Sequence, residues 1–188
     1  MELGKQILSG DSRALSKAIS LIEQGHPYGP KIMRYVHSYT GKSYTVGITG
    51  PPGAGKSTII AGLTGMYRAE GKSVGVVAAD PSSPYSGGAL LGDRIRMEPY
   101  YLDSNVFIRS MATRGGTGGL PRIIKCVVRL LDAFGKDVVL VETVGVGQTE
   151  LDITNVADIV VVILVPEAGD VIQTLKAGIM EIGDIFVV

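Results

Sequence analysis

The sequence has few of the features that mark secreted, membrane or nucleic-acid-binding proteins. Its 188 residues include one cysteine, Cys126, which excludes an internal disulfide and fits a reducing compartment. Lys and Arg total 18, as do Asp and Glu, so no basic surplus favours nucleic acid or an anionic membrane as a partner. The longest apolar run, residues 159–165, is far too short to cross a bilayer. The N-terminus has no signal-peptide pattern, so we expect a soluble, cytoplasmic protein with no nucleic-acid or membrane partner.

The composition is that of a well-packed globular domain. Hydrophobic residues make up 45% of the chain and charged residues 19%, which is enough apolar surface for one core. Cys126 itself lies in an apolar helical pattern, which favours a buried structural thiol over a reactive one.

Residues 1–43 are predicted to form an N-terminal helical extension. Asp11 is a candidate N-cap, and apolar residues then recur at helical spacing until Gly25. A second helix is expected to begin at Pro30 and to end at Gly41.

From Tyr44 onward, apolar runs alternate with helical patterns. Strands are expected at residues 44–49, 73–79, 105–110, 137–142, 158–165 and 184–188. Helices are expected at residues 56–70, 92–102, 119–134 and 171–181. Continuous runs of Val and Ile are typical of parallel strands buried on both faces. The alternation predicts an α/β fold with a doubly wound, mostly parallel sheet over residues 44–188.

The segment from Gly50 to Ser57 fits the phosphate-binding pattern G-x-x-x-x-G-K-[ST] at every required position. It lies between an expected strand and an expected helix, the context that the motif needs. Glycines let the backbone wrap around phosphate oxygens, and the helix N-terminus adds a positive dipole end. Lys56 is predicted to reach the β- and γ-phosphates, and the Ser57 hydroxyl to bind Mg²⁺. The candidate phosphate-binding residues are Gly50, Pro51, Pro52, Gly53, Ala54, Gly55, Lys56, Ser57 and Thr58.

Acidic residues follow the second expected strand, on the side where open α/β sheets bind their ligands. Asp80 ends that strand, one unit after the phosphate loop, and its carboxylate is a candidate for the Mg²⁺ shell, directly or through water. Asp93 is a weaker candidate, because an acid beside Arg94 also fits a surface ion pair. An ordinary turn would equally explain the Pro, Ser and Gly residues between the two acids.

The fourth expected strand ends at Glu142, and Gly145 follows three residues later. A carboxylate at a strand tip can hold the water shell of a metal, and the Gly145 N–H can meet a terminal phosphate. Loss of that phosphate would let the loop relax, as in an order–disorder switch. The alternative is a buried acid that caps a loop. Val146 stands near the usual place of a water-orienting Gln, and Gln148 lies further on, so we expect slow intrinsic hydrolysis.

A third candidate loop follows the fifth expected strand. Asp170, Gln173 and Lys176 fall at i, i+3 and i+6, so each neighbours the next along a helix start. From the pattern alone, a solvated helix surface is slightly favoured over a functional loop.

The phosphate loop and four further segments, residues 80–97, 107–115, 142–148 and 176–181, are long and specific. Together they resemble the MeaB/ArgK/MMAA family of P-loop GTPases of the SIMIBI class, over nearly the whole chain. The resemblance implies binding of GTP or GDP with Mg²⁺, slow hydrolysis, and a chaperone role toward adenosylcobalamin-dependent methylmalonyl-CoA mutase. Nucleotide state would gate cofactor loading and protection of the mutase.

The resemblance also implies roles for individual residues. Those implied for the Mg²⁺ shell and switch carboxylates are Ser57, Asp80, Asp93 and Glu142. Those implied for catalysis are Lys56, Asp93 and Glu142. Those implied for a nucleotide-responsive loop that relays the bound state to the mutase are Asp170, Gln173 and Lys176.

The chain departs from the family pattern at its end. In the family, an Asn-Lys-x-Asp motif that selects guanine follows the last expected strand, and a C-terminal helical region builds a homodimer. The sequence stops at Val188, before that motif. We therefore expect the phosphate half of the site in this chain, without the base half and without the dimer-forming region.

Two other functions fit the same phosphate loop. A small-molecule kinase would need an acceptor loop rich in arginine, and the available arginines are Arg94, Arg96, Arg109 and Arg114. A non-hydrolysing interaction module would bind a partner without turnover. A dimerising ATPase related to septum-site or arsenite proteins is disfavoured, because that group needs a second, early Lys where this chain has Pro51 and Pro52.

Overall fold

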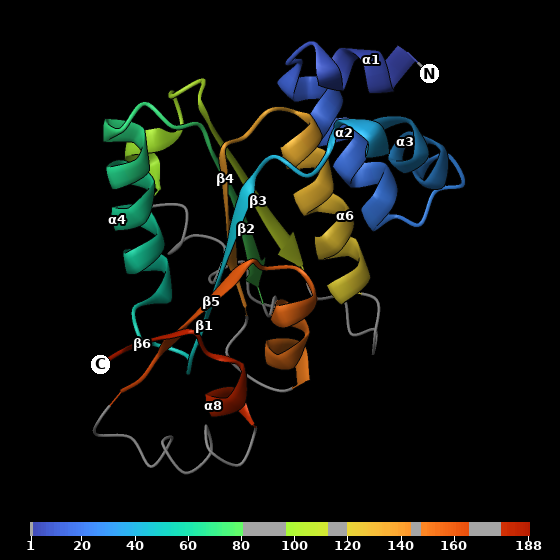
Figure 1. The fold of residues 1–188 in the computed structure, drawn as a ribbon. Coiled ribbons are helices and arrows are strands. Elements are labelled where there is room, and N and C mark those ends of the chain that lie inside the picture. The colour runs from blue at the N-terminus through green and yellow to red at the C-terminus, as the bar shows by residue number, and fades with distance from the viewer. Residues whose placement is uncertain (1, 81–96, 113–119, 144–147, 166–177) are drawn as a thin grey trace.

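The computed structural model describes residues 2–80, 97–112, 120–143, 148–165 and 178–188. At the centre of these residues lies a six-stranded sheet with the order β3-β2-β4-β1-β5-β6, in which every pairing is parallel (Figure 1). The strands are β1 (Tyr44–Thr49), β2 (Val74–Asp80), β3 (Val106–Ala112), β4 (Val138–Glu142), β5 (Ile159–Ile163) and β6 (Ile185–Val187). Each begins and ends within two residues of an expected strand, so the predicted α/β class is confirmed.

Helices cover both faces of the sheet. Helix α4 (Lys56–Ala69) lies on one face and α6 (Leu120–Ala133) on the other (Figure 1). The remaining elements are α1 (Glu2–Leu8), α2 (Ser12–Glu23), α3 (Gly29–Val36), η1 (His37–Tyr39), η2 (Glu98–Tyr100), η3 (Gln148–Asn155) and α8 (Ile179–Ile182). In the described parts of the chain, no helix has both the length and the apolar character that a bilayer crossing requires.

Each face of the sheet has its own hydrophobic core. On the α4 side, Ile48 of β1 and Leu140 of β4 pack with Ile60 of the helix. On the α6 side, Val141 of β4 packs with Leu131 of the helix. Side chains of successive strand residues point to opposite faces, so strands rich in Val and Ile supply both cores.

The N-terminal helices pack onto α6 and share its core. Asp11 caps α2 as expected, since its Oδ1 accepts hydrogen bonds from the N–H groups of Arg13 (2.8 Å) and Ala14 (3.1 Å). Leu15 and Ile19 of α2 are fully buried in the same cluster as the α6 residues. Figure 1 shows α1, α2 and α3 gathered beside α6, away from α4. The division into an extension and a nucleotide-binding domain at residue 43 stays a prediction.

The link between the N-terminal helices and β1 is fixed by one carboxylate of α6. Asp132 is buried and accepts hydrogen bonds from the backbone N–H groups of Gly41, Lys42 (3.1 Å) and Ser43 (3.0 Å). Three backbone donors satisfy a carboxylate that would otherwise be costly to bury. The chain therefore enters β1 from a fixed point.

Aspartates at the amino ends of strands bond to the backbone of neighbouring strands. The Ser73 N–H donates to Asp137 Oδ2, the Thr45 N–H to Asp158 Oδ2 and the Val160 N–H to Asp184 Oδ2, each at 2.7 Å. Asp137 also accepts a hydrogen bond from the Ser73 hydroxyl at 2.7 Å. These bonds hold the strands in register at the end of the sheet opposite the phosphate loop.

The helix expected over residues 92–102 is wrong in the part that the structure describes. There the chain forms only the single 3₁₀ turn η2, and the other residues of that prediction lie outside the described ranges. Pro99 gives the reason: it has no N–H, and its ring clashes with the carbonyl four residues earlier in a helix interior. Pro99 is tolerated in η2 because it stands in the first turn.

The cysteine lies on α6, as the apolar pattern predicts, but it is half-buried and not fully enclosed. Burial raises the pKa of the Cys126 thiol above its ordinary value of 9.0, against the opposing effect of nearby arginines and Lys125. A raised pKa leaves little thiolate at neutral pH, so the thiol is a poor nucleophile.

Candidate functional site

The phosphate-loop motif connects the carboxyl end of β1 to the first turn of α4. Gly53 and Gly55 have φ angles of +78° and +87°, in the left-handed region that glycine adopts without steric cost. Gly55 is the N-cap of α4, and no side chain caps that helix start. The backbone N–H groups at such a start are the groups that bind anions. The loop therefore has the form that the sequence motif predicts.

Gly50, the first glycine of the motif, is constrained by packing as well as by its φ of +142°. A Cβ atom built there would lie 2.4 Å from the carbonyl oxygen of Ile163, the last residue of β5. That is closer than any real Cβ approaches a backbone oxygen, so one strand of the sheet borders the loop directly at this point.

Lys56, the first residue of α4, lies buried at the base of the loop, with 6% of its surface exposed. Its Nζ donates hydrogen bonds to the carbonyl oxygens of Gly50 (3.0 Å) and Pro51 (2.9 Å). Burying an ammonium is costly unless it is paired, and these carbonyls offset part of that cost. The cation is thus held directly against the loop that the motif assigns to phosphate.

Ser57 and Glu142 meet across the space between α4 and β4. The Ser57 hydroxyl donates a hydrogen bond to Glu142 Oε1 at 2.9 Å, and Glu142 is buried, with 7% of its surface exposed. The sheet order explains the meeting, because β4 lies beside β1 and Glu142 pairs in register with Ile48. Two residues that are 85 positions apart in the sequence are therefore neighbours.

The chemistry of this pair suits a divalent cation of the magnesium type. Hydroxyl and carboxylate oxygens are hard ligands, which Mg²⁺ prefers. Within the described residues, no group of three His, Cys, Asp or Glu side chains could hold a metal. Ser57 and Glu142 fit a site that would take its other ligands from a nucleotide, from water or from residues outside the described ranges.

Two threonines form a contact between β1 and the end of β4, and the sequence did not reveal it. Thr143 Oγ1 donates to Thr49 Oγ1 at 2.9 Å, and the Thr143 N–H donates to the Ile48 carbonyl at 3.1 Å. Both threonines are buried. Thr49 ends an apolar strand and Thr143 follows one, each directly beside a predicted site residue. The sequence carries that signal, but the pairing of the two threonines depends on the strand order.

Asp80 ends β2 at the same carboxyl edge of the sheet. β2 lies beside β4, and Ala78 pairs in register with Glu142, so the Asp80 backbone stands two residues beyond the level of Glu142. The structure describes the backbone of Asp80 and not its side chain. Its predicted Mg²⁺ role stays a prediction.

Several predicted site residues lie outside the described residues. These are Asp93, Gly145, Asp170, Gln173 and Lys176. Gln148 begins η3, but its side chain is not described. The roles assigned to all of these residues stay predictions.

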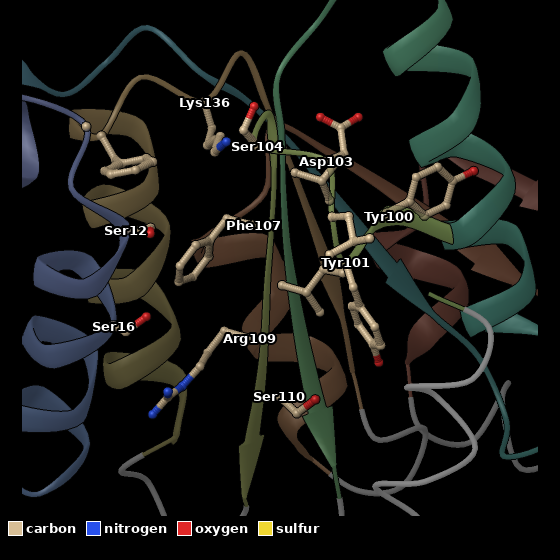
Figure 2. Close-up of a pocket in the computed structure, with 15 residues that line it drawn as sticks. Ser12, Ser16, Tyr100, Tyr101, Asp103, Ser104, Phe107, Arg109, Ser110 and Lys136 are labelled. Carbon is tan, nitrogen blue, oxygen red and sulfur yellow. The ribbon is translucent and has the colours of Figure 1, made fainter. Parts of the chain in front are cut away.

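A cavity of about 660 Å³ lies along β3, and none of the predicted phosphate or metal residues lines it. Figure 2 shows Phe107 and Arg109 pointing to one side of the strand, toward α2, and Tyr101 standing on the other. Arg109 forms an ion pair with Glu23 and donates a hydrogen bond to Ser20 Oγ at 3.2 Å. That pairing counts against Arg109 as an acceptor-binding residue of a kinase.

Comparison with protein-family models and curated proteins gives consistent matches. The family model described as "Methylmalonyl Co-A mutase-associated GTPase MeaB" matches residues 15–188. A protein of Pyrococcus abyssi with a provisional GTPase name is 54% identical over 100% of this chain and 58% of its own length. The GTPase ArgK of Escherichia coli (strain K12) is 36% identical over 98% of this chain and 57% of its own length. The chain thus spans little more than half the length of these relatives.

Solved structures agree with these matches. A crystal structure described as an LAO/AO transport system kinase superimposes with a TM-score of 0.73 at 30% identity, over 98% of this chain and 54% of that one. HypB from Helicobacter pylori superimposes with a TM-score of 0.52 at 17% identity, over 92% of this chain and 70% of that one, which shows a shared fold alone. From the family match over residues 15–188, the chain belongs to the MeaB family of methylmalonyl-CoA mutase-associated GTPases.

Proposed function

We propose that this chain carries the phosphate- and Mg²⁺-binding half of a GTPase that hydrolyses GTP slowly. The observation that carries the proposal is the Ser57–Glu142 hydrogen bond of 2.9 Å. It lies beside the loop whose carbonyl oxygens accept hydrogen bonds from Lys56. A cation, a hydroxyl and a buried carboxylate converge there on a loop whose backbone suits phosphate.

The backbone of the loop supplies most of the phosphate contacts in this proposal. The N–H groups from Gly53 through Thr58 surround the β-phosphate, and Lys56 exchanges its carbonyl partners for β- and γ-phosphate oxygens. The exchange is favourable because an ammonium binds an anionic oxygen more strongly than it binds a neutral carbonyl. Lys56 would therefore act as a phosphate ligand when a nucleotide is bound.

Ser57 and Glu142 are the described side chains that would hold Mg²⁺. Asp80, described in its backbone alone, and Asp93, outside the described residues, are the further residues proposed for the site. When bound, Mg²⁺ neutralises charge on the β- and γ-phosphates. With the metal bound, the Ser57 hydroxyl oxygen would serve as a ligand in place of its hydrogen bond to Glu142. Glu142 would then hold the metal through hydrogen bonds that it accepts from metal-bound water.

The terminal phosphate would be sensed by the segment that follows Glu142. In this proposal the Gly145 N–H contacts the γ-phosphate, and Asp170, Gln173 and Lys176 respond to its loss. Val146 stands near the usual position of a water-orienting Gln, so intrinsic turnover is slow and a partner accelerates it.

The partner in this proposal is methylmalonyl-CoA mutase, because the family description names it. Nucleotide state would then gate loading of adenosylcobalamin and protection of the mutase. In this proposal, guanine selection and homodimer formation come from the part of the family pattern that the resemblance places after Val188, and this chain spans 58% and 57% of the length of two relatives.

A kinase is the second candidate, because a structure that is 30% identical to this chain is described as one. Titration with fluorescent GTP and ATP analogues, each with Mg²⁺ and with a chelator, separates the candidates. We expect both triphosphates to bind in a Mg²⁺-dependent way, with release of inorganic phosphate and no phosphorylated acceptor. Transfer of phosphate from ATP to a small metabolite would replace the GTPase proposal by the kinase. A failure of both triphosphates to bind would leave an interaction module.

A further inference from the structure

The Thr49–Thr143 pair lies where two functional segments leave the sheet. Thr49 directly precedes Gly50 of the phosphate loop, and Thr143 directly follows Glu142. The two hydroxyl oxygens are 2.9 Å apart, and the exposed fractions of the two residues are 0% and 3%. The bond therefore connects the root of the phosphate loop to the root of the segment that leads to Gly145.

This bond and the Ser57–Glu142 bond lie on opposite faces of the same strand tip. Successive side chains of a strand point to opposite faces, so Glu142 and Thr143 diverge. Glu142 meets Ser57 on the α4 side, and Thr143 meets Thr49 on the other side. The tip of β4 is thus bonded to the phosphate-loop unit on both faces.

The two bonds differ in what nucleotide binding demands of them. In the proposed function, Ser57 and Glu142 give up their mutual hydrogen bond when they turn to a metal. The threonine pair contains no proposed ligand, so it can stay closed during that exchange.

Burial alone does not require hydroxyl groups at these two positions. Valine has nearly the shape of threonine and suits a buried strand at least as well. Replacing both partners of a buried hydrogen bond by apolar groups of the same shape is close to neutral for stability. What such a replacement removes is the directional bond that fixes one strand end against the other.

We propose that Thr49 and Thr143 are positioning residues, which hold the phosphate loop and the tip of β4 in register while Ser57 and Glu142 exchange their hydrogen bond for a metal. The inference rests on the proposed nucleotide function and extends it to two residues that contact neither phosphate nor metal.

The test compares the unaltered 188-residue chain with the double variant Thr49→Val/Thr143→Val and with Thr143→Ser, which keeps the hydroxyl. Thr64→Val is the matched control, because Thr64 is also fully buried and donates its hydroxyl to the Ile60 carbonyl at 2.7 Å, within α4. Two quantities are measured: hydrogen exchange at the Thr143 amide, and the Mg²⁺ concentration needed for binding of a fluorescent GTP analogue.

We expect the double variant to melt within a few degrees of the unaltered chain, because the paired replacement is close to neutral. Its backbone amide at position 143 should exchange about fivefold faster with Mg²⁺ and GTP present, the loss that corresponds to one hydrogen bond. Its Mg²⁺ requirement should rise by a similar factor, while binding in chelator changes less than about twofold. Thr143→Ser and Thr64→Val should each leave both quantities at the values of the unaltered chain.

If the double variant shows the same amide exchange and the same Mg²⁺ requirement as the unaltered chain, the inference is overturned and the proposed function is not. The same change in Thr64→Val as in the double variant would also overturn it, because any lost buried hydroxyl would then suffice. Absence of Mg²⁺-dependent GTP binding in the unaltered chain would overturn the proposed function first, and the inference with it.

Discussion

The two ends of the sheet use similar side chains for different purposes. At the amino ends of the strands, Asp137, Asp158 and Asp184 accept hydrogen bonds from backbone N–H groups. At the carboxyl ends, Glu142 accepts a hydrogen bond from the side-chain hydroxyl of Ser57. A backbone donor is fixed by the fold, whereas a hydroxyl rotates and can serve as a metal ligand. The donor, more than the carboxylate, distinguishes a structural contact from one that can be exchanged.

The same contrast holds for Lys56 and Lys136, the lysines that are buried in the part of the chain that the structure describes. Lys56, at the carboxyl end, donates to carbonyls of the phosphate loop. Lys136, at the amino end, donates to the Asn105 carbonyl at 2.8 Å and lies 5.5 Å from the Phe134 ring centre. Both are nearly fully buried, with 6% and 5% exposed. We therefore expect changes at the carboxyl end to alter nucleotide binding, and changes at the amino end to alter stability.

The largest effect is expected for Lys56→Ala. Loss of the ammonium should lower triphosphate affinity and turnover together, with turnover falling on the order of 100-fold, because a preorganised charge at the transferred phosphate is removed. Phosphate release and fluorescent-nucleotide titration measure the two quantities. Lys136→Ala is the matched control and should lower the melting temperature with nucleotide binding retained. Unchanged turnover in Lys56→Ala would argue against the phosphate role.

A smaller effect is expected for Glu142→Ala. Removal of a carboxylate beside the metal should weaken the Mg²⁺-dependent part of GTP binding about 10- to 100-fold while the fold remains. Titration of Mg²⁺ at fixed GTP, with circular dichroism as the check on folding, measures both. Asp158→Ala, at the other end of the sheet, should leave the Mg²⁺ dependence intact. An unfolded Glu142→Ala chain would support the alternative of a buried structural acid.

Asp132→Ala should act on stability alone. Three backbone N–H groups lose a charged acceptor, so the free energy of unfolding should fall by about 2–4 kcal/mol. For a chain of this size the melting temperature would drop by roughly 5–15 °C, which thermal unfolding followed by circular dichroism measures. A change in the Mg²⁺ requirement as large as that of Glu142→Ala would break the contrast between the two ends.

The smallest effect is expected for the pH dependence of stability that Asp137 contributes at the amino end of the sheet. The backbone and hydroxyl hydrogen bonds from Ser73 hold the pKa of the Asp137 carboxyl below its ordinary value of 3.8. A lowered pKa contributes stability above pH 3.8, and that contribution is lost as the pH falls through the folded pKa. Denaturant unfolding should therefore show Asp137→Asn as less stable than the unaltered chain near pH 6. The difference should shrink below pH 4, and a gap that persists there would contradict the assignment.

The sequence predicted the elements well, because their signals are local. Apolar runs placed each strand, the glycine pattern placed the phosphate loop, and Asp11 placed the start of α2. The helix expected over residues 92–102 is wrong in its described part, because Pro99 fits the first turn of η2 and not a helix interior.

Contacts between elements could not be predicted, because they depend on the order of strands in the sheet. Ser57 and Glu142 were each predicted as site residues, but their mutual bond spans 85 positions. The Thr49–Thr143 bond spans 94 positions and joins β1 to β4, strands that are not consecutive in the chain. A strand pattern shows that a residue ends a strand, and only the sheet shows which strand lies beside it.

The contact of Gly50 with the Ile163 carbonyl bears on how the motif would behave under selection. Gly53 and Gly55 meet no protein atom within 4 Å of an added Cβ, so their glycine requirement comes from backbone conformation and from the ligand. A library of this chain selected only for folding, with no nucleotide present, would keep glycine at position 50 most strictly. The first glycine of the phosphate-binding motif would then persist in selected variants that no longer bind a ligand.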